Sequence, residues 1–109
     1  MEDLIKSIDL YKEDPLKLSE IGLQLSAQLF YHNTNMADAE LKEKETMLNY
    51  FKEGATIGQK RSVAESELYG VTETFNDYGK LKVQGEAVME IINSIKKRIE
   101  VLNIERQRV

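Results

Sequence analysis

A cluster of cations near the C-terminal end contains the residue types that most clearly suggest a chemistry. Consecutive residues of an α-helix are turned by about 100°, so three adjacent cations there flank Ile95 and Ile99 on both sides and do not form one flat patch. Cations carried by a helix can neutralise the phosphates of nucleic acid. The cluster consists of Lys96, Lys97, Arg98, Arg106 and Arg108.

Two interpretations of this cluster are open. In the first, the cations flank a coiled-coil seam and pair with Glu86, Glu90, Glu100 and Glu105. In the second, they form a strip that binds single-stranded nucleic acid and becomes continuous only when several copies assemble. Tyr69, Phe75 and Tyr78 could stack on bases, although the helical spacing of Phe75 and Tyr78 favours core packing. The cations that could extend the strip are Lys60, Arg61, Lys80 and Lys82.

The residue types argue against an enzyme. The chain has no cysteine, which excludes disulfides, thiolate zinc sites and cysteine nucleophiles. His32 is the only histidine, so we expect it to have a structural role and not to bind a metal. The serines lack a nearby histidine, and there is no Gly-rich phosphate loop. We therefore expect no catalytic residues, no metal, no cofactor and no small-molecule substrate.

Composition and charge are typical of a helical protein. A length of 109 residues predicts one domain, and 31% charged residues of mixed sign resemble a long-helix or coiled-coil composition. The net charge of −4 argues against indiscriminate nucleic-acid binding, but residues 94–109 carry five cations and two anions. The acidic N-terminus is not a signal peptide, and no apolar run reaches the roughly 18 residues of a membrane span. We expect a cytoplasmic protein.

The first half of the chain predicts a short helix and a long one. Residues 3–12 have an apolar face, and Asp14 with Pro15 suits the start of a helix over 15–52. Two apolar stripes on the long helix predict burial on two sides in its first half, and their unbroken spacing favours one helix through Asn33–Asn35. One stripe is Leu23, Ala27, Phe30, Thr34, Ala37, Leu41, Lys44, Leu48 and Phe51, and the other is Ile21, Leu25, Leu29, His32 and Met36.

A turn is expected at residues 52–56. Gly54 can adopt the left-handed conformation that follows a helix, and Thr56 with Gln59 fits a capping box that starts the next helix. So short a connection predicts that the next helix, over 56–107, runs antiparallel to the long one. Glycines at 70, 79 and 85 predict a kink, a close approach or a break near 70–80. The expected fold is an all-α, coiled-coil-like helical hairpin with a short N-terminal helix.

The closing helix carries an apolar seam that we expect to drive self-association, because a long two-helix hairpin cannot bury both sides of its helices. Replacing Ile95 with Asp would then dissociate the oligomer by burying an unpaired charge. The expected oligomer interface is Leu81, Val88, Ile92, Ile95, Ile99 and Leu102.

In three places the sequence resembles UvsY-type bacteriophage recombination mediators, over about residues 20–108. These are the Phe51-Lys-Glu-Gly54 turn, the spacing from Phe75 and Tyr78 to the closing helix, and the run Ile92-Asn-Ser-Ile-Lys-Lys-Arg-Ile99. The acidic balance and the shorter connection between helices depart from that family. The resemblance implies a phage accessory protein that oligomerises, binds single-stranded DNA and helps load a recombinase, with residues 96–98 along the strand.

A second hypothesis is a phage-encoded inhibitor or adaptor that binds a host protein. Its working surface would be acidic residues of the long helix, which imitate phosphate charge. A plain structural coiled coil is the third possibility, and composition does not separate these classes. The acidic residues are Asp38, Glu40, Glu43, Glu45 and Glu53.

Overall fold

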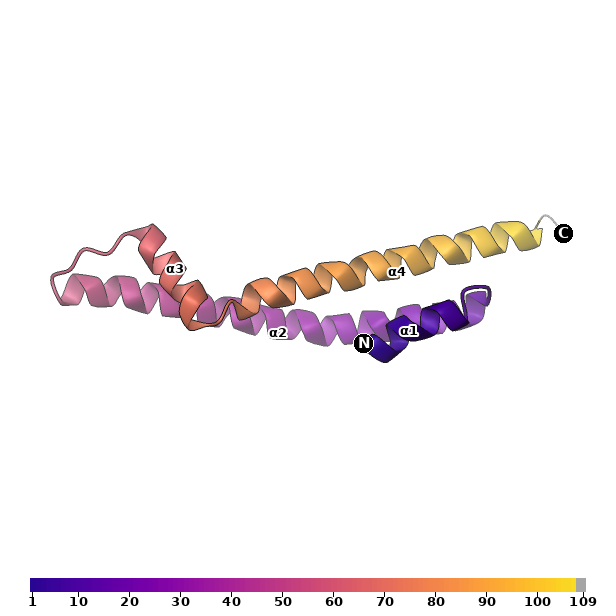
Figure 1. Cartoon of the computed structure of the whole chain (residues 1–109), viewed down its shortest axis with the longest axis horizontal. Helices are drawn as coiled ribbons and strands as arrows, with labels where there is room; N and C mark the ends of the chain where they lie inside the picture. Colours follow the sequence, from indigo (N-terminus) through magenta and orange to yellow (C-terminus); the bar gives the residue numbers. More distant parts are fainter. Residues whose placement is uncertain (108–109) are drawn as a thin grey trace. The chain divides into compact units, whose positions relative to one another are not determined.

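The computed structural model describes residues 1–107 and is all-α, as predicted, with no strand among those residues. Its elements are α1 (Glu2–Leu10), α2 (Pro15–Thr56), α3 (Val63–Glu73) and α4 (Asp77–Gln107) (Figure 1). The chain forms two compact units. The first joins Met1–His32 to the chain from Gln84 onward, and the second is Asn33–Val83.

In the first unit, the start of α2 packs on the larger part of α4, and the two run in opposite directions (Figure 1). Both helices bury apolar residues spaced by three and four positions, which places them on one side of each helix. The side chains of Leu4, Ile5 and Ile8 on α1 pack against this core and are half-buried. The core is Leu18, Ile21, Leu25 and Leu29 with Val88, Ile92, Ile95 and Leu102.

The start of α2 agrees with its sequence signals. The Asp14 Oδ1 atom accepts a hydrogen bond from the backbone N–H of Lys17 at 3.2 Å, and the Asp14 carbonyl accepts one from the Leu18 N–H at 3.0 Å. Pro15 is the first residue of the helix. The helix continues through Asn33–Asn35, as the apolar spacing indicates.

Only one of the two predicted stripes of α2 is buried. Leu25 is fully buried and His32 is 8% exposed, whereas Leu23 and Phe30, in the stripe that we expected to be covered as well, are 70% and 68% exposed. The expectation of burial on two sides is therefore wrong for this chain by itself. α1 and α4 cover the side of Leu25, and the opposite side of α2 stays open to solvent.

In the second unit, α3 approaches α2 closely at a glycine. A Cβ atom on Gly70 would lie 2.9 Å from the Glu43 carbonyl oxygen and 3.2 Å from the Met47 Cβ atom, so the two helix backbones come together where a side chain is absent. Ser66, one turn earlier on α3, is 1% exposed and donates a hydrogen bond to the Ser62 carbonyl at 2.9 Å. Small residues thus permit this packing.

The turn predicted at residues 52–56 lies later in the chain. α2 extends to Thr56, so Gly54 is a buried helical residue and Thr56 is not an N-cap. A Cβ atom on Gly54 would lie 2.7 Å from both the Gln59 carbonyl oxygen and the Arg61 side chain, because the loop folds back over it. Gly58 takes the left-handed conformation with φ of 75°, and Ser62 caps α3 by accepting the Glu65 N–H at 3.0 Å.

The helix expected over 56–107, with a kink, close approach or break near 70–80, is two helices, α3 and α4, and the break lies at residues 74–76. The Thr74 hydroxyl donates to the Gly70 carbonyl at 2.7 Å, and Phe75 and Asn76 both have left-handed φ values of 55° and 54°. Asn76 then precedes α4, and its side chain occupies the space that a Cβ atom on Gly79 would need. Phe75 is 77% exposed, so the expectation that it packs in the core is wrong.

Replacing Gly70 with Ala should lower the stability of the second unit. The added Cβ atom would meet backbone in α2, which cannot move as a side chain does, and this steric cost should exceed the roughly 1 kcal/mol that alanine gains over glycine in a helix. Urea unfolding followed by circular dichroism measures the change.

Gly22→Ala is the matched control. Its Cβ atom would lie 3.5 Å from the Cγ2 atom of Ile95, an ordinary van der Waals contact, so this variant should be more stable by roughly 0.5–1 kcal/mol. Equal stabilisation by both substitutions would contradict the close approach at Gly70.

Candidate interaction surfaces

The seam that we expected to bind other copies is largely the core of the first unit. Val88, Ile92, Ile95 and Leu102 are all less than a tenth exposed, and they pack on α1 and α2 of the same chain. Ile99 is half-buried beside them, and Leu81, in the second unit, is also half-buried. The spacing correctly identified a packing face, but its partner is in the same chain and not in another copy.

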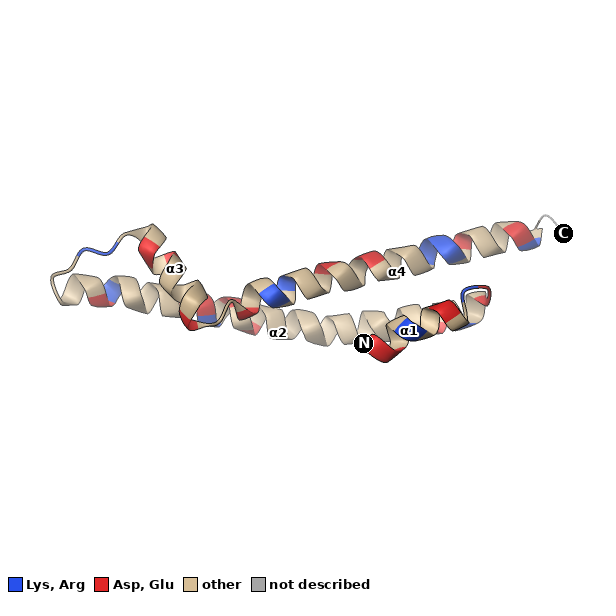
Figure 2. Cartoon of the chain, in the orientation of Figure 1, with Lys and Arg blue, Asp and Glu red and all other residues tan. Residues whose placement is uncertain are grey.

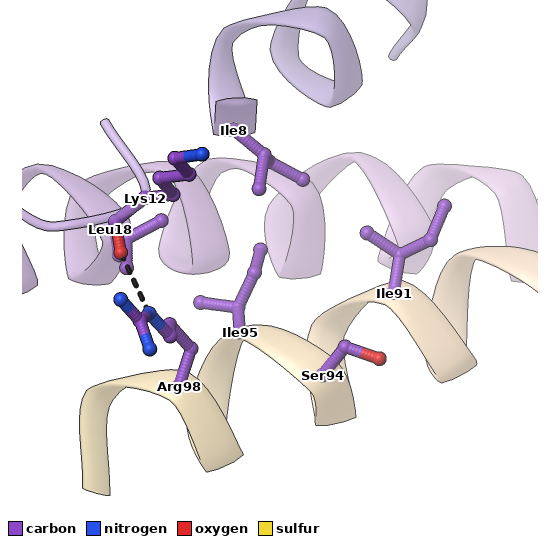
Figure 3. A pocket seen from close by; sticks show the side chains of 7 residues that line it. All are labelled: Ile8, Lys12, Leu18, Ile91, Ser94, Ile95 and Arg98. Carbon is purple, nitrogen blue, oxygen red and sulfur yellow. Dashed lines mark hydrogen bonds between the residues drawn. The ribbon is translucent and has the colours of Figure 1, made fainter. Parts of the chain in front are cut away.

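Arg98 is used within the first unit. Its Nε atom donates a hydrogen bond to the Lys12 carbonyl at 2.8 Å (Figure 3). Its Nη2 atom also lies 3.7 Å from the Glu13 carboxylate. Arg98 therefore fastens the α1–α2 connection to α4. It borders an apolar groove of about 260 Å³ in which Ile8 and Leu18 face Ile91 and Ile95.

Lys96 and Lys97 remain exposed in the same stretch. Figure 2 shows a blue band of Lys and Arg toward the C-terminal end of α4. Neither lysine forms an ion pair within residues 1–107, so the expected pairing with nearby glutamates is absent from that part of the chain. Arg106 is exposed in the last turn of α4, and Arg108 lies outside the described residues. Lys96, Lys97 and Arg106 are the cluster members with exposed charge.

The other predicted cations belong to the second unit. Lys60, Lys80 and Lys82 are exposed, but Arg61 is not: its side chain is 15% exposed. Arg61 donates a hydrogen bond from Nη1 to the Tyr50 carbonyl at 2.9 Å and lies 3.6 Å from a Glu53 carboxylate oxygen. Arg61 fixes the α2–α3 loop. Arg61 and Arg98 are thus engaged within the chain and do not belong to the candidate nucleic-acid surface.

An aromatic stack accompanies Arg61. The guanidinium carbon lies 3.8 Å from the centre of the Tyr50 ring, and the Tyr69 ring stacks on Tyr50 with centroids 4.0 Å apart and planes at 17°. Two planar groups this close to one ring cannot share a face, so Tyr50 lies between Arg61 and Tyr69. Tyr69 thus contributes to the α2–α3 contact, which sequence spacing did not indicate.

Some of the predicted acidic residues of α2 pair with cations of the same chain, and others are exposed. Glu40 pairs with Lys44 at 2.8 Å, and this contact raises the pKa of Lys44, while Glu53 pairs with Arg61. Glu43 is half-buried where α3 approaches. Asp38 and Glu45 are exposed and form no ion pair within residues 1–107. The part of the chain that the structure describes has no cluster of potential metal ligands.

No protein-family model, curated protein or solved structure matches this chain. Among the described residues, no helix is long and apolar enough to cross a membrane.

Replacing Ile95 with Ala should destabilise the first unit. Ile95 is 3% exposed, and removing so buried a side chain leaves a cavity that costs about 2–5 kcal/mol. Ile104→Ala, at a position 49% exposed, should change the free energy of unfolding by no more than about 1 kcal/mol. Thermal unfolding of both variants tests this, and an unchanged midpoint for Ile95→Ala would contradict the intrachain core.

Arg61→Ala should loosen α3 from α2. The substitution removes the contact with the Tyr50 ring and a hydrogen bond to a carbonyl, together worth about 1–3 kcal/mol. Hydrogen exchange should accelerate at the amides of 63–73 and stay unchanged in α1. Lys60→Ala is the control because Lys60 is exposed, and equal exchange in the two variants would show that Arg61 does not hold the loop.

Proposed function

We propose that this chain is a non-enzymatic phage accessory protein that acts in DNA recombination or replication, in the host cytoplasm. It binds single-stranded DNA as an assembly of several copies, through Lys96 and Lys97 with Arg106 nearby. The observation that carries the proposal is the exposure of Lys96 and Lys97, adjacent on α4 and without a carboxylate partner in residues 1–107.

The charge of these lysines is available for phosphate because neither of them forms an ion pair with a glutamate within residues 1–107. The two lysines neutralise few phosphates, so one copy binds weakly, and assembly multiplies such contacts by raising the effective concentration of the second one. Long-range attraction is limited by the net charge of −4. The proposed binding is therefore sensitive to salt and dependent on assembly.

The resemblance of residues 92–99 to the closing segment of recombination mediators supports single-stranded DNA as the ligand and a recombinase as a protein partner. The structure places Arg98 of that segment against Lys12 and Glu13, so the lysines would contact the strand and the arginine would hold the helix that presents them.

A protein inhibitor or adaptor is the second candidate function. The observation that favours it is the pair Asp38 and Glu45, which share one side of α2, are exposed and form no ion pair within residues 1–107. They would present phosphate-like charge to a basic site on a host protein. This candidate predicts a one-to-one protein complex and no binding to nucleic acid.

The double substitution Lys96→Ala/Lys97→Ala should weaken binding to a fluorescent single-stranded oligonucleotide and reduce its salt dependence. Each phosphate contact to single-stranded DNA contributes about 0.7 to the slope of log K against log salt concentration, so losing two contacts should reduce the slope by about 1.4 per protomer. Fluorescence anisotropy across a salt series measures both quantities.

Lys42→Ala/Lys52→Ala is the matched control, since it removes the same charge from exposed positions on α2. Equal loss of binding in the two variants would indicate a general charge effect and not a site. If the parent protein shows no binding even at low salt, single-stranded DNA is excluded as the ligand and Asp38 and Glu45 become the residues to test.

A further inference from the structure

α2 has an exposed apolar face opposite the one that packs in the first unit. We call it the outer stripe, and it follows α2 at alternating steps of four and three residues through Leu16, Glu20, Leu23, Ala27, Phe30, Thr34, Ala37, Leu41, Lys44 and Leu48. Large apolar side chains thus lie on both sides of α2, buried on one side and exposed on the other. A helix that packs against two partners has this pattern. The large residues of the outer stripe, with their exposed fractions, are Leu16 (70%), Leu23 (70%), Phe30 (68%), Leu41 (58%) and Leu48 (46%).

The outer stripe keeps a strict heptad repeat. Leu16, Leu23 and Phe30 occupy one seam position, while Leu41 and Leu48 occupy the other. A straight α-helix has 3.6 residues per turn and drifts away from such a repeat by about 20° per heptad. The repeat stays on one side only if the helix supercoils with a partner helix. The spacing itself therefore indicates that another long helix covers this face.

Two charged residues in the outer stripe identify that helix and its direction. Glu20 and Lys44 occupy seam positions near opposite ends of the stripe, with exposed fractions of 51% and 66% for their side chains. A parallel, in-register pair would place each beside its own copy, which is repulsive. We propose that the outer stripe binds the outer stripe of a second copy in the antiparallel direction, with Glu20 of each copy opposite Lys44 of the other.

That alignment matches large residues with large ones on both sides of the charge pair. Leu16 meets Leu48, and Leu23 meets Leu41, so the ion pair is bracketed by leucine layers that exclude water from it. Burial of these leucines supplies the affinity. The two Glu20–Lys44 pairs supply register and direction, a role for which polar seam residues are well attested.

The centre of the stripe is also self-complementary. In the same alignment Ala27 meets Ala37, and Phe30 meets Thr34, so each layer combines residues whose sizes suit one another. The dimer contains two Phe30–Thr34 layers, and the two-fold axis that passes midway between them converts one layer into the other. A copy of the same helix therefore satisfies all these pairings at once.

Shifting the two helices by one heptad destroys the match. In one direction Glu20 would meet Ala37, and in the other it would meet Phe51 while Lys44 met Ala27. Both shifts bury a charge against an apolar side chain, which is costly without a partner. Several antiparallel alignments place one seam position opposite the other over a long overlap. Only one of them pairs Glu20 with Lys44.

The flanks of the stripe agree with the same alignment. Lys17 and Glu45 follow seam positions on one flank and would lie near each other across the interface. In the single chain the seam charges have partners along their own helix, Lys17 for Glu20 at 3.4 Å and Glu40 for Lys44 at 2.8 Å. Antiparallel association would join these pairs into mixed-sign clusters and leave no like charges opposed.

Charge reversal tests the proposal without any nucleic acid, so its outcome is independent of the proposed DNA ligand. Glu20→Lys and Lys44→Glu should each raise the dissociation constant of the dimer by more than about tenfold, because each creates like-charge pairs in two layers. The double variant Glu20→Lys/Lys44→Glu should restore dimerisation. Sedimentation equilibrium gives the dissociation constants. Both positions are exposed in the single chain, so the substitutions should leave the helices intact, and circular dichroism checks that the helix content is unchanged.

Engineered cysteines test the direction and register separately. The native chain has none, so any disulfide formed is the designed one. An equimolar mixture of Ala27→Cys and Ala37→Cys chains should form a disulfide-linked heterodimer under mild oxidation, and neither variant alone should form a comparable homodimer. The mixed pair Ala27→Cys and Glu45→Cys is the mismatched control.

Three results would overturn the proposal. The first is a parent protein that stays monomeric up to its solubility limit. The second is a dimer whose dissociation constant is unaffected by either charge reversal, which would place the interface elsewhere or make the helices parallel. The third is efficient cross-linking of Ala27→Cys with itself, since that residue meets its own copy only in a parallel pair.

Discussion

The packing of α2 on α4 in the first unit is the interaction on which the other features depend. It buries Leu25 completely and brings Gly22 within contact distance of Ile95. Burying a side chain such as these stabilises the fold by about 1.5–3 kcal/mol, and no other part of the described chain gathers as many buried apolar residues. α1 contributes half-buried side chains and closes the core from the other side, where Arg98 fastens its connection to α2.

α2 has two apolar faces, and the chain buries only one of them, so the other remains in contact with water. The covered face meets α1 and α4, whereas Leu23 and Phe30 of the outer stripe are 70% and 68% exposed. An apolar surface that continues along a helix is uncommon on a monomeric protein and usually marks an interaction site. The burial pattern of α2 is thus the observation behind the proposed dimer, while the residues first expected to mediate assembly stabilise the single chain.

Arginine and lysine have different roles in this protein for a chemical reason. Arg61 and Arg98 each reach a backbone carbonyl and a carboxylate, and Arg61 also stacks on a ring, which the planar guanidinium group permits. Lys96 and Lys97 have compact, strongly hydrated charges that remain in solvent. The exposed charge of the predicted cluster is thus carried by Lys96, Lys97 and Arg106, and a count of basic residues overestimates the positive charge at the surface.

Local sequence signals determined much of the secondary structure. The Asp14–Pro15 start of α2, its continuity through Asn33–Asn35 and the all-α fold follow from capping, proline geometry and apolar spacing. These signals act between residues a few positions apart. The extension of α2 past Gly54, by contrast, depends on the loop that folds over that glycine. The glycines indicated an irregularity near 70–80, but its form, a break at residues 74–76, depends on hydrogen bonds around Thr74 and Asn76 that spacing does not reveal.

Tertiary structure alone decided which apolar face meets which partner. Periodicity shows that Ile92 and Ile95 share a side of a helix, but it is the same for a face that packs on its own chain and one that packs on another. Which face is buried depends on how α1, α2 and α4 pack on one another in three dimensions. For the same reason, the sequence placed Leu23 and Leu25 in stripes of equal standing, and only packing made Leu25 core and left Leu23 exposed.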